Sequence, residues 1–237
     1  ANVNDIKKMG RYDNPEGLFK GFMMVLGYFK YKNKDTPLMM DECLSTLCVA
    51  PPGTGKTTTA IELAKYITGE TNSNRVMLLS FNHDTSYSDT IGGIGKKSAN
   101  TDWDYIIGSI ASFCDRANND LKNPYICILD EINRANTAAV LGELITAMSK
   151  RGVYVTTNHN KRIVVPRNVW FIGTMNSTDN SISELDTALV DRFQIYEMPE
   201  IIVDCDKIRQ KKESELGISL PENLVIGMEY VNDAIVA

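Results

Sequence analysis

Short apolar runs alternate with segments of helical periodicity along the middle of the chain. Continuous apolar runs of this length are typical of parallel strands that are covered on both faces. The alternation predicts an α/β fold with a largely parallel sheet, whose binding residues gather at the carboxyl ends of the strands. The expected strands are 44–49, 75–81, 125–129 and 169–172, and the expected helices are 58–67, 103–118 and 137–149.

The remaining segments carry other patterns. Asn14-Pro15 is a helix-start signal, and apolar residues follow at helical spacing from Leu18 to Phe29, so a core-facing amphipathic helix is expected there. The tail from residue 204 onward has a mostly helical pattern. Further expectations are a polar linker at 31–40, a glycine-rich loop at 92–95, and a hairpin formed by 153–157 and 162–165.

Composition places the chain among ordinary globular proteins, because 43% of its 237 residues are hydrophobic and 23% are charged. Its net charge of −5 gives no global attraction to nucleic acid, so any such contact needs a local patch or another domain. The five cysteines form no C-x-x-C pair, and Cys48 and Cys127 lie inside apolar runs. We expect them to be buried core residues in a reducing compartment.

The sequence has no apolar segment near the ~20 residues needed to cross a bilayer. The N-terminus also lacks the basic and then apolar pattern of a secretory signal. We therefore expect a cytoplasmic protein with no membrane partner. Because the chain begins abruptly at Ala1, we expect it to be a piece of a larger protein.

The stretch from Ala50 to Thr57, APPGTGKT, lies between an expected strand and an expected helix. In such a loop, backbone N–H groups and the helix N-terminus cradle phosphates, the lysine reaches the β- and γ-phosphates, and the hydroxyl after it binds Mg²⁺. The usual pattern begins with Gly, where this chain has Ala50. The alternative is a Gly/Pro-rich turn with an accidental Lys-Thr. The expected nucleotide-binding residues are Pro52, Gly53, Thr54, Gly55, Lys56, Thr57 and Thr58, with Thr57 also at the metal.

Two more strand ends carry polar side chains. Asp130-Glu131 follows the strand 125–129, so Asp130 would hold the Mg²⁺ shell and Glu131 would deprotonate the attacking water. Asn176 follows the strand 169–172 and could hold that water near the γ-phosphate. Each signal is weak alone, since many strands end in acids and an Asn there is often a turn residue. An upstream phosphate loop makes the combination specific.

Arg192 follows a further helical stretch and is the candidate arginine finger. Phosphoryl transfer gains from a guanidinium at the developing charge, often one supplied by a neighbouring subunit. The alternative is a surface arginine paired with Asp191 or Asp186.

Together these residues resemble the AAA+ ATPase superfamily, and within it the McrB-like branch, the GTP-dependent motor of modification-dependent restriction systems; MoxR-type ATPases are near relatives. The resemblance also draws on DEINRAN from Asp130 to Asn136, Gly142-Glu143-Leu144 and Asp191-Arg192-Phe193. It implies a three-layer P-loop core with a parallel sheet and a partial C-terminal helical lid. The implied division is an N-terminal helix and linker at 1–40, the AAA+ core at 41–200, and the start of an incomplete lid at 201–237.

The family signature Met-Asn-Thr-Ala-Asp-Arg-Ser appears here as MNSTDNS from Met175 to Ser181. By this resemblance Asp179 is a nucleotide-binding candidate, whereas Asn180 replaces the family's Arg. The departure leaves GTP and ATP both open as the substrate. Mg²⁺ is the implied cofactor.

The resemblance implies an NTP-hydrolysing motor subunit in a ring, expected to be a hexamer. Its implied partner is a McrC-like nuclease subunit, with DNA recognised through another domain or the partner. Two alternatives are a MoxR-like protein-remodelling ATPase and a nucleotide-gated scaffold, although intact Lys56, Asp130, Glu131 and Asn176 argue against an inactive scaffold. The basic cluster Lys150, Arg151, Lys161, Arg162 and Arg167 is either a solvated face or a pore, partner or DNA-phosphate contact.

Overall fold

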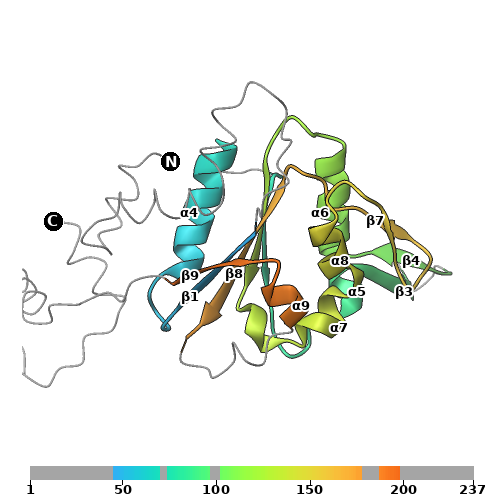
Figure 1. Cartoon of the computed structure of the whole chain (residues 1–237). Helices are drawn as coiled ribbons and strands as arrows, with labels where there is room; N and C mark the ends of the chain where they lie inside the picture. The colour runs from blue at the N-terminus through green and yellow to red at the C-terminus, as the bar shows by residue number, and fades with distance from the viewer. Residues whose placement is uncertain (1–44, 70–73, 97–101, 178–186, 198–237) are drawn as a thin grey trace, which may run out of the picture.

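The computed structural model describes residues 45–69, 74–96, 102–177 and 187–197 (Figure 1). The expected N-terminal helix, the linker, the helical tail and the lid lie outside the described residues. Asp179 and the other residues of the signature after Ser177 also lie outside them, up to residue 186. The description below therefore concerns the expected core.

Five strands form one sheet in the order β2-β5-β8-β1-β9, and every neighbouring pair is parallel. This confirms the predicted α/β class with a parallel sheet. It also brings the carboxyl ends of four strands together, since Ala50 pairs with Asn176, Leu129 with Gly173 and Ser80 with Asp130. The strands are β1 (Ser45–Ala50), β2 (Val76–Ser80), β5 (Tyr125–Asp130), β8 (Val169–Asn176) and β9 (Gln194–Glu197).

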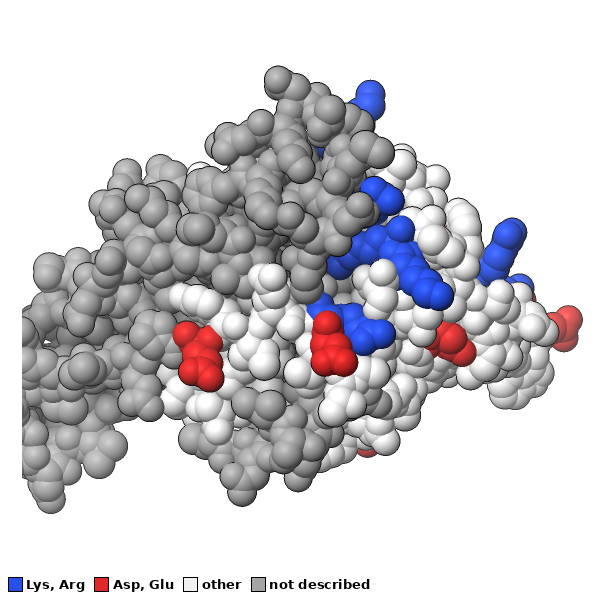
Figure 2. All heavy atoms as spheres, in the orientation of Figure 1, with Lys and Arg blue, Asp and Glu red and all other residues white. Residues whose placement is uncertain are grey.

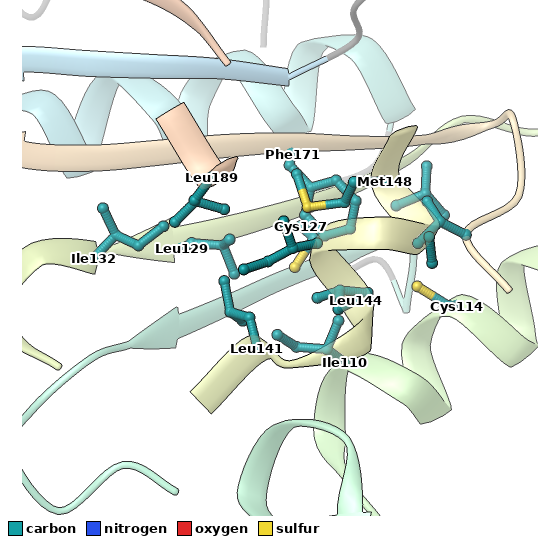
Figure 3. Packing of buried hydrophobic residues seen from close by; sticks show 14 of the residues in the cluster. Ile110, Cys114, Cys127, Leu129, Ile132, Leu141, Leu144, Met148, Phe171 and Leu189 are labelled. Atoms are coloured by element: carbon teal, nitrogen blue, oxygen red, sulfur yellow. The ribbon is translucent and has the colours of Figure 1, made fainter. Parts of the chain in front are cut away.

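Helices cover both faces of the sheet, which gives three layers (Figure 1). Side chains alternate along a strand, so β5 sends Ile126 and Ile128 to one face and Cys127 and Leu129 to the other. The first pair packs in a cluster with α4 (Lys56–Thr68), and the second packs with the helices of the opposite layer (Figure 3). That opposite layer contains α6 (Ser109–Asn118), α7 (Thr137–Leu141) and α8 (Glu143–Ser149).

The prediction of one helix over 103–118 was wrong in its first part. Residues 103–107 form β4 (Trp103–Ile107), which pairs antiparallel with β3 (Gly92–Lys96), and the helix begins only at Ser109. The glycine-rich stretch is therefore a strand and not a loop. Its glycines leave room for neighbouring side chains: a Cβ on Gly92 would lie 2.3 Å from the Tyr105 hydroxyl, and one on Gly95 would lie 2.8 Å from Ile106.

The expected helix 137–149 is broken at Gly142 into α7 and α8, because this residue has φ 45° and ψ −123°. A Cβ there would lie 2.7 Å from the ring of Tyr87, the first residue of the short helix α5 (Tyr87–Thr90). The predicted hairpin is confirmed by the antiparallel pair β6 (Val155–Thr156) and β7 (Arg162–Ile163). The other short helices are the 3-10 helix η1 (Ile132–Arg134) and α9 (Thr187–Val190).

The cysteines that the structure describes are buried and reduced. Cys48, Cys114 and Cys127 are fully buried in the two core clusters. Burial raises the pKa of the Cys114 thiol to about 12 and raises the pKa of the Cys127 thiol well above its usual value. The expectation of buried core residues is thus met for Cys48 and Cys127. None of the described helices is long and apolar enough to cross a membrane.

Candidate functional site

A glycine-containing loop joins the end of β1 to the start of α4. Gly53 and Gly55 have φ angles of 77° and 80°, a conformation that a side chain disfavours, and Thr54 Oγ1 donates to Pro51 O at 2.9 Å. The first N–H groups of α4 have no partner within the helix, and the helix dipole favours an anion at this end. The loop is therefore shaped to bind phosphate. Ala50 is the last residue of an extended strand, where a methyl group in place of hydrogen causes no strain.

Lys56 links this loop to the end of β8. Its side chain is buried, at 7% exposure, and Nζ donates to Ala50 O at 2.9 Å, Pro51 O at 2.8 Å and Asn176 Oδ1 at 2.9 Å. A buried ammonium group is costly without such acceptors. The structure thus brings Lys56 and Asn176 together, as expected for two groups at one phosphate-binding edge.

Asp130, at the end of β5, accepts hydrogen bonds from two threonines. Thr57 Oγ1 and Thr174 Oγ1 each donate to Asp130 Oδ1 at 2.6 Å, and Ser80 Oγ lies 3.4 Å from Oδ2. Hydroxyl and carboxylate oxygens are the donor atoms that Mg²⁺ prefers, usually together with waters and substrate phosphates. The contact between Thr57 and Asp130 beside the loop therefore fits a hydrated Mg²⁺ held at these two side chains.

Glu131 directly follows Asp130 and has an unusual backbone. Its φ of 53° and ψ of 45° are left-handed, which is uncommon for a residue other than glycine and is often found at functional sites. The backbone N–H of Glu131 donates to Thr174 Oγ1 at 3.0 Å, and Oε1 forms an ion pair with Arg134 Nη2 at 2.9 Å. The Glu131 side chain is 32% exposed. It is therefore anchored at its backbone and accessible to water at its carboxylate.

Arg192 lies apart from these residues. It follows α9 and precedes β9, and its N–H donates to Leu189 O at 2.9 Å. Gln194 pairs with Thr46, four residues before Ala50, and four strand residues at about 3.3 Å each span ~13 Å. The segment with Arg192 thus leads into the amino end of β9, at the sheet edge opposite the phosphate loop.

Three residues at this edge were not identified from the sequence. Ser80 ends β2, Arg134 pairs with Glu131, and Thr174 bonds to both Asp130 and Glu131. The sequence carried one usable signal, since Thr174 is a polar residue inside an otherwise apolar strand that ends in Asn176. Of the other candidates, Pro52 and Thr58 are exposed on the loop and the first turn of α4.

The basic cluster divides into two kinds of contact. Arg151 is half-buried: it donates to Val169 O and to Ser45 Oγ and lies over the Phe171 ring, so it has a structural role. Lys161 and Arg162 are exposed and lie over the rings of Tyr105 and Tyr154, at 5.2 and 5.4 Å from the ring centres. Basic side chains gather on the face seen in Figure 2, where Figure 1 shows α8.

Comparison with known proteins gives two matches. The family model described as "AAA domain (dynein-related subfamily)" matches residues 46–193, which include the phosphate loop, Asp130-Glu131, Asn176 and Arg192. The chain is also 37% identical over 161 residues to the "Type IV methyl-directed restriction enzyme EcoKMcrB subunit" of Escherichia coli (strain K12). The match covers 62% of this chain and 34% of that protein, so the chain spans about a third of its relative's length.

Proposed function

The chain belongs to the AAA domain family, in its dynein-related subfamily, and on this basis we propose that it is a nucleoside triphosphatase subunit that hydrolyses GTP or ATP with Mg²⁺. The observation that carries the proposal is the convergence of three strand ends. Lys56, at the start of α4 after the loop that follows β1, contacts Asn176 of β8, and Thr57 contacts Asp130 of β5. The proposed ligands of phosphate, metal and water therefore lie at one edge of the sheet, which supports the proposal.

Each residue has a separate task in the proposed reaction. The loop from Pro52 to Thr58 binds the phosphates, and Lys56 exchanges its carbonyl partners for phosphate oxygens. Thr57 and Asp130 would hold Mg²⁺, which would supply positive charge to neutralise the phosphates. Glu131 accepts a proton from the attacking water, and Asn176 orients that water. Asp179 is proposed as a further nucleotide contact by family resemblance alone.

Nucleotide titration tests this assignment most simply. Fluorescent GTP and ATP analogues should bind the wild-type chain, and Lys56→Ala should bind neither, because it removes the charge that holds the phosphates. Lys65→Ala is a matched control, since Lys65 lies on the same helix but pairs with Glu62 at the surface. Equal binding by Lys56→Ala and Lys65→Ala would contradict the proposed site.

We further propose that Arg192 acts in trans in a ring oligomer, expected to be a hexamer. Its position at the sheet edge opposite the loop supports action on a neighbouring subunit. Specific activity should then rise with protein concentration, and Arg192→Ala should bind nucleotide but hydrolyse it poorly. Mixing Arg192→Ala with Lys56→Ala should restore part of the activity, because some interfaces combine an intact loop with an intact arginine. Mixed assemblies without recovery, verified by native mass spectrometry, would refute the trans role.

The relative's name makes it a subunit of a methyl-directed restriction enzyme. We propose that this chain is likewise the motor part of a restriction system in the cytoplasm. A McrC-like nuclease would be its partner, and DNA recognition would lie in another domain or in the partner. Co-expression with a nuclease encoded beside it tests this: nucleotide turnover should rise on complex formation, and no effect on turnover would contradict the pairing.

A further inference from the structure

Thr174 lies beside both acidic residues of the proposed site. It is fully buried on β8, two residues before Asn176, and its hydroxyl makes two hydrogen bonds. Oγ1 donates to Asp130 Oδ1 at 2.6 Å and accepts from the Glu131 N–H at 3.0 Å. The hydroxyl therefore links the proposed metal-binding carboxylate to the backbone of the proposed base.

The two bonds restrain different parts of the site. On Asp130, the bond fixes the carboxylate rotation in which the same oxygen, Oδ1, accepts from Thr57. On Glu131, the bond satisfies a backbone N–H at a residue with left-handed φ, a conformation that persists only where the surroundings hold it. A buried hydroxyl has one proton to donate, and here that proton goes to a carboxylate, which forms the stronger class of hydrogen bond.

We propose that Thr174 is a positioning residue that aligns Asp130 for Mg²⁺ and Glu131 for the attacking water. The inference rests on the proposed function of this edge. Outer-shell partners of metal ligands commonly change metal affinity or activity by about 10- to 100-fold when they are removed. We expect a loss of the same size when the Thr174 hydroxyl is removed. The loss should affect Mg²⁺ binding and turnover, whereas the affinity for nucleotide without metal should not change.

The chain offers a matched control in Thr46. This threonine is also fully buried in the same sheet, on the neighbouring strand β1, and its Oγ1 has no hydrogen-bond partner within the described part of the chain. Thr46→Val and Thr174→Val therefore make the same chemical change at equal burial. Only the second change removes a contact to Asp130 and Glu131.

The test measures binding of a fluorescent N-methylanthraniloyl nucleotide in EDTA and across a Mg²⁺ titration, together with steady-state turnover, on the full chain. In EDTA, Thr174→Val should bind nucleotide as the wild type does. It should need an about 10-fold or higher Mg²⁺ concentration to reach half of the Mg²⁺-dependent change in nucleotide binding, and its kcat should be about 10- to 100-fold lower. Thr46→Val should match the wild type in every readout. Thr174→Ser keeps the hydroxyl and should restore both the Mg²⁺ response and kcat.

Several results would overturn the inference. The inference is wrong if Thr174→Val behaves like Thr46→Val. It is also wrong if Thr174→Ser is as impaired as Thr174→Val, because the effect would then come from packing at this position and not from the hydroxyl. If circular dichroism shows that Thr174→Val does not fold, the comparison of Thr174→Ala with Thr174→Ser replaces it, and equal Mg²⁺ responses in that pair would refute the role. A wild type that binds nucleotide with a Mg²⁺ effect but never hydrolyses it would refute the proposed hydrolysis alone. One that binds no nucleotide would remove both claims.

Discussion

Gly142→Ala is expected to destabilise the fold more than an ordinary glycine substitution. Gly142 has φ 45° and ψ −123°, outside the regions that L residues favour, and such strain is of order 1–3 kcal/mol. The new Cβ would lie 2.7 Å from the Tyr87 ring and displace it. Tyr87 Oη donates to Glu143 Oε2 at 2.7 Å, and a hydrogen bond to a charged group contributes ~1.5–3 kcal/mol. The expected loss in the free energy of unfolding is therefore about 2.5–6 kcal/mol.

Urea unfolding followed by circular dichroism measures this loss, with Gly69→Ala as the control. Gly69 also has positive φ, at 73°, but nothing lies within 4 Å of its would-be Cβ, so it should lose only about 1–2 kcal/mol. Tyr87→Phe removes the hydroxyl but keeps the ring. Gly142→Ala should cost about 1.5–3 kcal/mol less in that background, because the hydrogen bond is already gone. Equal losses for Gly142→Ala and Gly69→Ala would refute the role assigned to the Tyr87 contact.

Three further results are expected. Asn176→Ala should leave nucleotide affinity nearly unchanged but lower kcat by about 10²-fold or more, because a water-positioning contact acts mainly in the transition state; parallel losses of affinity and rate would indicate a structural turn. Hydrogen bonds from Ser86 lower the pKa of Asp89 below 3.8, so the stability gap between wild type and Asp89→Ala should be complete above about pH 5 and shrink as the pH falls below 3.8; a constant gap in urea titrations would contradict this. Cys48 and Cys127 should resist thiol reagents at neutral pH until the protein unfolds, since burial raises the pKa of both thiols, and rapid labelling of the native protein would show otherwise.

The central strands and the phosphate loop could be predicted because their signals are local. Buried parallel strands read as continuous apolar runs, and the order of β5, β8 and the loop then places Asp130, Asn176 and Lys56 at one edge. The contacts themselves could not be predicted. That Lys56 reaches Asn176, or that Thr174 bonds to Asp130 and Glu131, depends on strand register, which no local pattern specifies.

The errors have physical causes in residues distant along the chain. The segment 92–96 contains three glycines, which strands disfavour, yet it pairs with β4 because Tyr105 and Ile106 occupy the space that Cβ atoms would take. The break at Gly142 likewise depends on Tyr87, which is 55 positions earlier. β9 was not predicted, because its four residues alternate too briefly to give a signal.

The central claim, that this edge of the sheet hydrolyses nucleotide with Glu131 as the base, is tested most directly by single-turnover hydrolysis with Glu131→Gln. GTP and ATP are each mixed with excess protein and Mg²⁺, and binding is measured on the same samples. The control is Glu62→Gln, which removes a carboxylate from the surface of α4. Glu131→Gln should bind nucleotide as the wild type does and leave it uncleaved, while Glu62→Gln cleaves it normally. Cleavage by Glu131→Gln at the wild-type rate would contradict the account.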